Sequence, residues 1–222
     1  MKYQLVIFDW DGTLVDSTGR IVDSMQLAAA EVGLPVVPDS AVQNIIGLGL
    51  PEALRTVWPG IHDEQLDAMT QVYARNFVYD SKVSMDFFSG VAELLPALRS
   101  QGRLLAVATG KSRKGLSRMF TELFVDGAPV GEQFAASRCA DETRSKPDPL
   151  MLRELLTELG VAIDRAVMVG DTSWDLDMAA AIGMDTVAMS HGAHDDAALK
   201  ACGPKTICHS IAELKAWITQ NG

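Results

Sequence analysis

Two acidic residues, Asp9 and Asp11, follow directly after a short apolar run, Leu5–Phe8, in the segment Asp-Trp-Asp-Gly-Thr. Side chains alternate along an extended chain, so both carboxylates can face the same way if the extended conformation continues past Phe8. Neighbouring carboxylates repel each other, and a divalent cation relieves that repulsion. Because Mg²⁺ is commonly held by one or two carboxylates together with phosphate oxygens, the pair indicates a magnesium site. A surface loop could carry the same pair, but the apolar run before it and the Gly-Thr after it favour the metal site.

A second acidic pair, Asp171 and Asp175, stands at the end of another apolar run, residues 166–169. If a helix begins here, residues four apart lie on the same side of it. Asp171 can then complete the metal site, and Asp175 can orient a lysine such as Lys146. A helix-capping aspartate is the alternative interpretation, and capping does not exclude metal binding.

Two further segments offer groups that bind phosphate. Thr109, Gly110 and Lys111 follow the apolar run at residues 104–108, and a hydroxyl, a backbone amide and an ammonium can form a phosphate cradle. The segment does not fit a nucleotide-binding P-loop, because the glycine required five residues before Gly110 is a leucine. Lys146 can offset charge on a nucleophile and on a transferred phosphoryl group.

The apolar runs themselves predict strands. Continuous runs of four or five apolar residues suit strands buried on both faces of a parallel sheet, and weaker candidates occur at residues 186–189 and 206–207. Helical periodicity appears between the runs, at residues 91–98 and 149–159. Strands that alternate with helices predict an α/β fold, a doubly wound parallel sheet of the Rossmann-like type. In such sheets ligands bind beyond the carboxyl ends of the strands, so the polar segments should converge there.

Residues 16–88 have a different character, because no strand pattern appears over about 70 residues, far longer than an ordinary connection. Apolar residues at helical spacing predict one helix over residues 21–32 and another over residues 66–77. Ser40 and Gln43 fit a capping box that begins a further helix at Ser40. We therefore predict an α/β core domain formed by residues 1–15 and 89–222, with a helical cap domain of residues 16–88 inserted after the first strand.

The composition argues against several classes of partner. The 222 residues carry a formal net charge of −10 and a pI near 4.8, whereas binding to nucleic acids or anionic membranes favours a basic surface. The three cysteines have no CxxC spacing and are typical of free thiols in a reducing compartment. The apolar run before Asp9 is too short for a signal peptide or a membrane span, so we expect a cytoplasmic protein. His191 and His194 lack a clear third metal ligand, and we expect both to be solvated. The sequence carries no signal for an oligomeric state.

Taken in chain order, the four segments resemble the haloacid dehalogenase superfamily, most members of which are phosphatases. The matching motifs are Asp9-x-Asp11-Gly-Thr, Thr109, Lys146-Pro and Gly-Asp171-x-x-x-Asp175. The helical insertion resembles the helical cap of one subfamily, and the stretch FDWDGTLVDS is similar to phosphoglycolate phosphatase-like members. The resemblance implies a magnesium-dependent phosphatase, a phosphoric monoester hydrolase that acts on a small phosphorylated metabolite.

The same resemblance implies roles for the acidic residues. Asp9 would attack phosphorus and form an aspartyl-phosphate, whereas Asp11 would protonate the leaving oxygen and then deprotonate the hydrolytic water. Mg²⁺ would be held by Asp9, the backbone carbonyl of Asp11, and Asp171. Asp175 would support the site by orienting Lys146.

The resemblance also implies that Thr109, the Gly110 amide and Lys146 bind the phosphoryl oxygens. Many relatives carry asparagine where this chain has Gly110, so a side-chain contact is lost here. This departure leaves the role of Lys111 open.

A cap that closes over the site favours small substrates, with phosphoglycolate, a sugar phosphate and a nucleotide as the open choices. The loop at residues 47–49 resembles the specificity loop of the family. Arg55 is the cationic side chain nearest to it in sequence and is a candidate for substrate contact, with a solvated arginine as the alternative.

Single features separate the related activities. Dehalogenases of the superfamily lack the second acidic residue of the first motif, so Asp11 argues against that branch. Phosphonatases use a cap lysine, and no lysine occurs between Lys2 and Lys82. A phosphomutase shares the same core and stays open. A signalling receiver domain also combines acidic residues, a threonine and a lysine on a parallel sheet, but it accepts phosphate at a later strand and has no helical insertion.

Overall fold

The computed structural model describes residues 2–222. Six parallel strands form its central sheet, in the order β5-β2-β1-β6-β7-β8. Their bounds are β1 (Leu5–Phe8), β2 (Leu104–Thr109), β5 (Ala136–Cys139), β6 (Ala166–Gly170), β7 (Asp185–Met189) and β8 (Thr206–Cys208). A small antiparallel pair, β3 (Phe124–Val125) and β4 (Ala128–Pro129), stands outside this sheet.

The strand β1 lies at the centre of the sheet because it is apolar throughout and can be buried on both faces. All four of its residues are buried, and Leu5 is in register with Leu104 of β2 and with Ala166 of β6. The three apolar runs of the sequence are therefore three adjacent strands. The edge strand β5 has the sequence Ala-Ser-Arg-Cys and is only partly buried, so it has no apolar run from which it could be predicted.

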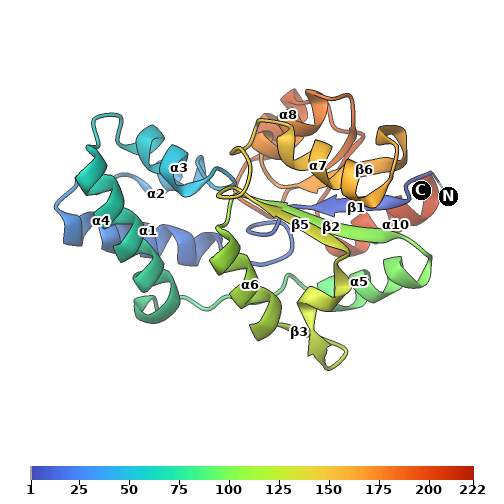
Figure 1. The fold of residues 1–222 in the computed structure, drawn as a ribbon, viewed down its shortest axis with the longest axis horizontal. Coiled ribbons are helices and arrows are strands. Elements are labelled where there is room, and N and C mark those ends of the chain that lie inside the picture. The colour runs from blue at the N-terminus through green and yellow to red at the C-terminus, as the bar shows by residue number, and fades with distance from the viewer. Residues whose placement is uncertain (1) are drawn as a thin grey trace.

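Helices cover both faces of the sheet (Figure 1). Val6 and Phe8 of β1 share a hydrophobic cluster with α5 (Val91–Ser100), α6 (Arg113–Glu122) and α10 (Ile211–Asn221). Leu5 and Ile7 point to the opposite face and pack with α7 (Leu150–Leu159) and α8 (Ser173–Ala180). A short helix, α9 (Asp196–Ala201), packs beside β8. The predicted doubly wound α/β fold is confirmed.

Residues between β1 and α5 form a helical segment with its own hydrophobic cluster, which includes residues from Ile21 to Phe77 (Figure 1, left). Its elements are α1 (Thr18–Val32), α2 (Asp39–Gln43), α3 (Leu50–Val57), α4 (Asp63–Arg75) and a π-helical turn, η1 (Asn76–Asp80). The capping box predicted at Ser40 is wrong. The helix α2 begins at Asp39 after Pro38, has no side-chain cap, and ends at Gln43.

Two chain connections join the helical segment to the sheet, and they pair with each other. The amide of Asp16 donates to the carbonyl of Asp86 over 2.8 Å, and the amide of Phe88 donates to the carbonyl of Leu14 over 3.0 Å. An antiparallel bridge between Val15 and Phe87 lies between these bonds. The entry and exit of the segment are therefore held side by side next to Asp9.

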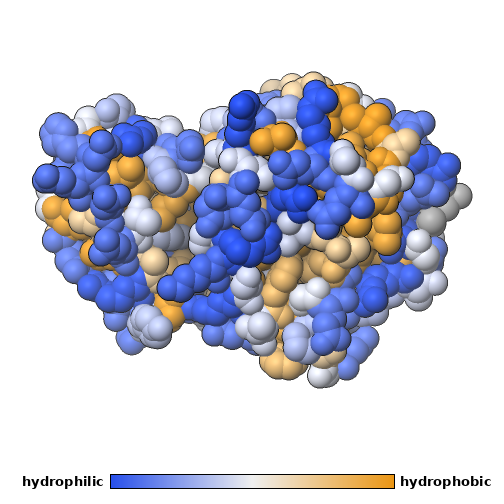
Figure 2. Space-filling model, viewed as in Figure 1, coloured by the Kyte–Doolittle hydropathy of each residue, from blue (hydrophilic) through white to orange (hydrophobic). Residues whose placement is uncertain are grey.

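The face of the molecule in Figure 2 is mainly hydrophilic, with hydrophobic residues gathered in separate patches. Within residues 2–222, no helix combines the length and the apolar character needed to cross a bilayer.

Candidate active site

The carboxyl ends of the central strands bring the predicted residues together. Asp9 follows β1, Thr109 ends β2 and Asp171 follows β6, and β1 lies between the other two strands. Parallel register places these three side chains at one edge of the sheet.

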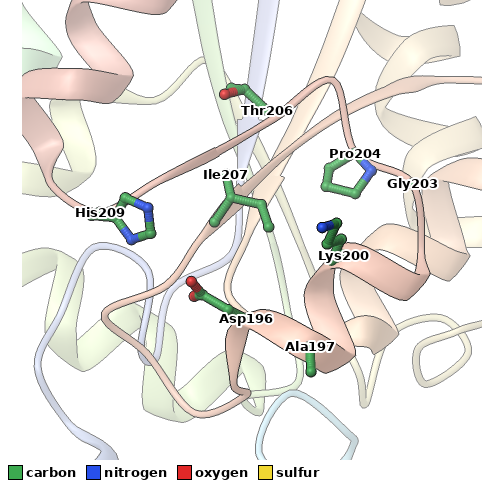
Figure 3. Close-up of a pocket in the computed structure, with 8 residues that line it drawn as sticks. All are labelled: Asp196, Ala197, Lys200, Gly203, Pro204, Thr206, Ile207 and His209. Carbon is green, nitrogen blue, oxygen red and sulfur yellow. The ribbon is translucent and has the colours of Figure 1, made fainter.

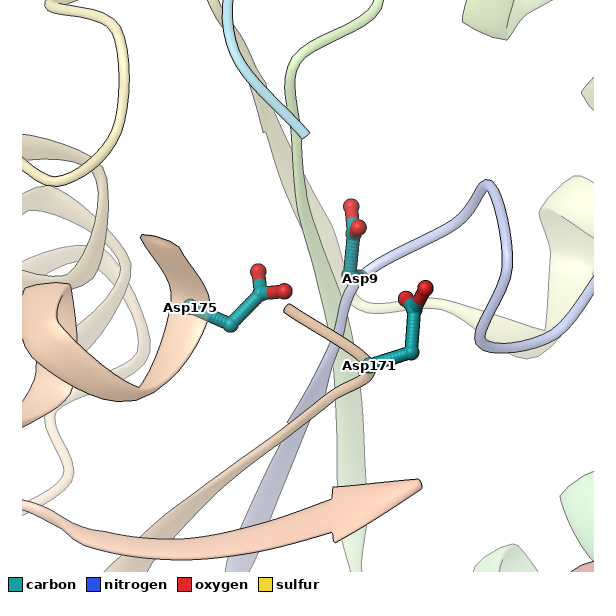
Figure 4. A group of neighbouring side chains, drawn as sticks. All are labelled: Asp9, Asp171 and Asp175. Carbon is teal, nitrogen blue, oxygen red and sulfur yellow. The ribbon is translucent and has the colours of Figure 1, made fainter. Parts of the chain in front are cut away.

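Three carboxylates form a buried cluster at this edge (Figure 4). Asp9, Asp171 and Asp175 each offer an oxygen, and these atoms all lie within 4.8 Å of one another. None of the three residues is more than 1% exposed. So much negative charge without solvent needs cationic partners.

Lys146 supplies one such partner from the segment before α7. Its Nζ lies 2.7 Å from Oδ1 of Asp9 and 2.6 Å from Oδ1 of Asp175. The other oxygen of Asp175 accepts hydrogen bonds from the amide and the hydroxyl of Thr172. Burial opposes the ammonium form, but the two carboxylates outweigh burial and raise the pKa of Lys146 above its ordinary value. Lys146 is therefore a buried cation with a fixed position.

Asp171 is held by donors on both of its oxygens. Oδ1 accepts from the hydroxyl of Thr13 over 2.6 Å, and Oδ2 accepts from the amide of Ala193 over 2.8 Å. A Cβ at Gly12 or Gly192 would lie 2.2 or 2.0 Å from Oδ2, so only glycine fits at either position. Burial, assisted by the nearby charge of Asp175, raises the pKa of Asp171 to about 7. Gly192 was not predicted from the sequence, where its only signal is its position after β7.

The donor set at this cluster fits a divalent cation. Oδ2 of Asp9 is buried and accepts no hydrogen bond from the described residues. Burial raises the pKa of Asp9 well above its ordinary range, although the Lys146 ammonium opposes that rise. One lysine does not balance three carboxylates, so a hard cation held by Asp9 and Asp171 would complete the charge balance.

The carboxylate of Asp11 contacts residues outside this cluster. Both of its carboxylate oxygens lie 2.9 Å from Nζ of Lys111, and the hydroxyl of Ser17 donates to Oδ1 over 2.7 Å. The chain turns at Gly12, whose φ is 80°. The carboxylates of Asp9 and Asp11 therefore have different lysine partners, and the side chain of Asp11 is not part of the cluster of three.

Thr109 and Gly110 lie where the helical segment meets the sheet. Thr109 is buried, and its Oγ1 accepts from the amide of Lys111 over 3.2 Å. A Cβ at Gly110 would lie 2.4 Å from the carbonyl oxygens of Gly47 and Leu48. The close approach of that backbone leaves no room for a side chain at position 110.

The loop of residues 44–49 is bonded to the sheet side of the site. The amide of Gly49 donates to Oγ of Ser145 over 2.7 Å. The indole Nε1 of Trp174, near the start of α8, donates to the carbonyl of Asn44 over 3.1 Å. These bonds hold the loop of the helical segment over the carboxyl ends of the strands.

The prediction that His191 and His194 are solvated is wrong. Nδ1 of His194 accepts from the amide of Ser173 over 3.1 Å, and its Nε2 lies 3.3 Å from the carbonyl oxygen of Asn44. The ring of His191 stacks on that of Phe88, with 3.8 Å between centroids. Both histidines are packed where the helical segment and its connections meet the sheet.

Arg55 lies on α3 and forms an ion pair with Asp63 of the same segment over 3.0 Å. Its side chain is 53% exposed. Among the described residues, no hydrogen bond or ion pair joins it to the carboxylate cluster, and its contact with substrate stays a prediction.

A surface hollow of about 590 Å³ lies at the edge of the sheet formed by β8, beside α9 (Figure 3). Asp196, Lys200 and His209 are among its lining residues. None of the residues gathered around Asp9 lines it.

The chain is similar to known proteins over most of its length. The family model of haloacid dehalogenase-like hydrolases matches residues 6–189. A phosphoglycolate phosphatase of Rhodospirillum rubrum is 31% identical over 221 residues, which cover 96% of this chain and 90% of that protein. A Mycobacterium tuberculosis protein named tyrosine-protein kinase PtkA is 36% identical over 190 residues, covering 85% of this chain and 62% of its own length.

The fold is shared with solved structures as well. The crystal structure of a predicted phosphoglycolate phosphatase from Haemophilus somnus has a TM-score of 0.87 and 23% identity, with 99% of both chains covered. The family and the hydrolase class predicted from the four motifs are confirmed: this chain belongs to the haloacid dehalogenase-like hydrolase family.

Proposed function

We propose that this hydrolase is a Mg²⁺-dependent phosphatase that cleaves a small phosphomonoester through an aspartyl-phosphate on Asp9. The observation that carries the proposal is the state of the Asp9 carboxylate. Oδ1 forms an ion pair with Lys146 over 2.7 Å, and both oxygens are buried and accept no hydrogen bond from the described residues. A buried carboxylate that accepts no hydrogen bond on either oxygen can offer one oxygen to a cation and the other to phosphorus, as a metal-assisted nucleophile requires.

In the first step, a carboxylate oxygen of Asp9 attacks phosphorus, and the new O–P bond forms as the bond to the leaving oxygen breaks. Thr109, the Gly110 amide and Lys146 bind the phosphoryl oxygens and stabilise their charge. In the second step, water attacks the aspartyl-phosphate, which releases inorganic phosphate and restores the Asp9 carboxylate.

Asp11 transfers the protons in both steps. It gives a proton to the leaving oxygen, becomes a carboxylate, and then takes a proton from the attacking water. Ser17 and Lys111 contact its carboxylate, which supports a fixed orientation of this group in both steps.

Mg²⁺ would be held by Asp9, Asp171 and the backbone carbonyl of Asp11, and when bound it would neutralise charge on the phosphoryl group. Asp175 has both oxygens engaged by Lys146 and Thr172, which supports a role in orienting Lys146.

We propose that residues 16–88 act as a cap domain on a core of residues 1–15 and 89–222. The loop at residues 44–49 covers the site through its bonds to Ser145 and Trp174, which favours a small phosphorylated metabolite over a phosphoprotein. Phosphoglycolate is a leading candidate because the Rhodospirillum rubrum relative carries that name. The free cysteines and the net negative charge support a cytoplasmic enzyme without nucleic acid or membrane partners.

The deciding experiment is a screen of the purified protein against a panel of phosphomonoesters with Mg²⁺, including phosphoglycolate, sugar phosphates and nucleotides. Sustained release of inorganic phosphate is expected, and Asp9→Asn should abolish it while the fold is kept. Asp16→Asn is the matched control, because that carboxylate is exposed. Near-normal turnover by Asp9→Asn would exclude the mechanism.

Three other outcomes would point to other functions. Isomerised sugar phosphate without phosphate release would indicate a phosphomutase. Transfer from ATP to a tyrosine peptide would indicate the activity named for the mycobacterial relative. A stable phosphoprotein that forms without turnover would indicate a receiver-like signalling domain.

A further inference from the structure

Lys111 occupies a position between the two parts of the molecule that none of the four motifs explains. We infer that Lys111 is a positioning residue, which fixes the orientation of Asp11 and makes that orientation depend on closure of the cap. The inference rests on the proposed function, because it assumes that Asp11 transfers the proton to the leaving group.

The first observation is the contact between Lys111 and Asp11. Nζ is 2.9 Å from both carboxylate oxygens, and each side chain is only 11% exposed. The hydroxyl of Ser17 adds a third bond to Oδ1. A charge-assisted contact to both oxygens resists rotation of the carboxylate, particularly where water is largely excluded.

The second observation is the contact between Lys111 and the helical segment. Nζ lies 4.6 Å from the centroid of the Phe77 ring, within the range of a cation–π interaction. Phe77 is 7% exposed and belongs to the π-helical turn η1, and its ring lies 5.9 Å from that of Tyr73 on α4. The ammonium therefore contacts the core through Asp11 and the helical segment through Phe77.

The third observation is that the backbone of Lys111 is anchored to the sheet side. Its amide donates to Oγ1 of Thr109 over 3.2 Å, and its carbonyl accepts from the amide of Ala140 over 3.1 Å. If the cap moves away, Phe77 leaves and Lys111 stays. The Lys111 ammonium then becomes hydrated and more mobile, and the Asp11 carboxylate loses its fixed partner. Asp11 is thus held for proton transfer in the closed arrangement.

This role predicts an effect that depends on the leaving group. Departure of an alkoxide needs a proton from Asp11, whereas para-nitrophenolate leaves readily without one. The parameter kcat/KM reports the step in which the leaving group departs, so it isolates this contribution. Since general acids contribute on the order of 10²–10⁴ in rate, Lys111→Met should lower kcat/KM for the best alkyl phosphate about 10- to 100-fold. The loss on para-nitrophenyl phosphate should stay within about 3-fold.

Two more variants separate the two contacts. Phe77→Leu keeps an apolar side chain but removes the ring, and it should give the same leaving-group pattern with a smaller loss, about 3- to 10-fold on the alkyl phosphate. Lys111→Arg keeps the charge and should recover part of the loss. Lys114→Met and Tyr79→Leu are the matched controls, because both side chains are exposed. Circular dichroism and thermal unfolding monitor the fold of each variant.

Equal losses on both substrates for Lys111→Met would overturn the inference, because a direct phosphate ligand or a merely structural lysine would behave in that way. If Lys111→Met does not fold, the kinetics of Phe77→Leu test the inference instead. Equal losses on both substrates in Phe77→Leu would also overturn it. Failure of the wild-type protein to release phosphate from any substrate would instead remove the proposed function itself.

Discussion

The ammonium of Lys146 lies 2.7 Å from the carboxylate of Asp9, and neither side chain is more than 1% exposed. The same ammonium reaches Asp175 over 2.6 Å. A buried cation that pairs with two acidic residues orients the carboxylate of Asp9. Because the pairs are buried, the stability of the fold also depends on this cation.

Replacement of Lys146 by methionine should therefore cost activity and stability together. Two carboxylates are left in the interior without their partner, and breaking a buried ion pair in this way costs about 3–5 kcal/mol. Urea unfolding measures the loss. The control is Lys205→Met, which removes a half-exposed ion pair with Asp185 and should cost at most about 1 kcal/mol. A stability loss no larger than in this control would contradict the structural role of Lys146.

Metal binding should be visible without any substrate. Excess chelator should silence the enzyme, and Mg²⁺ should restore it and raise the unfolding temperature. At 100 times the dissociation constant, the bound ion would add about 2.7 kcal/mol to the free energy of unfolding. Asp171→Ala should lose most of this stabilisation, whereas Asp164→Ala, at an exposed position, should keep it. Full activity in chelator would point to metal-free chemistry.

The glycine at position 110 should be required for closure. In Gly110→Ala, the new Cβ would lie 2.4 Å from two backbone oxygens, so the loop of residues 44–49 must shift. Displacements near 1 Å in an active site can cost on the order of 10²-fold in rate. We expect a loss of kcat/KM and faster hydrogen exchange at the Gly49 amide. Gly60→Ala, with open space around its Cβ, is the control. Unchanged kinetics and exchange in Gly110→Ala would mean that the loop is not held against the strands in solution.

A pH effect is expected away from the active site, at Asp185. Burial opposes ionisation there, but hydrogen bonds from Lys2, Lys205 and Tyr3 outweigh it and lower the pKa of Asp185 to about 2. A lowered folded-state pKa stabilises the protein above the unfolded value of about 4 and loses this contribution as the pH falls toward 2.

The measurement is the difference in urea unfolding between the wild-type protein and Asp185→Asn. Because solvent screens these part-exposed ion pairs, the wild-type protein should be more stable by at most about 1 kcal/mol at pH 6, and the difference should shrink as the pH is lowered from 4 to 2. A difference that does not change with pH would mean that the ion pairs of Asp185 do not stabilise the fold.

The sequence predicted the features that rest on local chemistry. The strands β1, β2 and β6 are apolar because they are buried on both faces, and the polar residues that follow Phe8, Ala108 and Val169 mark where the chain leaves the sheet. Their convergence then followed from the parallel topology. Edge strand β5 could not be found in this way, because it is only partly buried and its residues, Ala-Ser-Arg-Cys, form no apolar run.

What the sequence could not reveal depends on contacts between distant residues. The pairing of Asp11 with Lys111 joins positions 100 residues apart, and no spacing rule relates them. Gly192 is required by the carboxylate of Asp171, which becomes its neighbour only after the sheet forms. The contacts of His194 could not be predicted either, because the carbonyl of Asn44, which lies close to it, comes from the helical segment.

The position of β1 in the middle of the sheet has a consequence for synthesis of the chain. Leu5 cannot pair with Leu104 of β2 until the chain between them has been synthesised. At about 5–20 residues per second, the ribosome needs about 5–20 seconds for this synthesis. The helices between them are contiguous in sequence and share their own hydrophobic cluster, so they can fold during that interval. The apolar strand Leu5–Phe8 has no partner strand until then, so it stays unpaired on the nascent chain for longer than any other strand of the sheet.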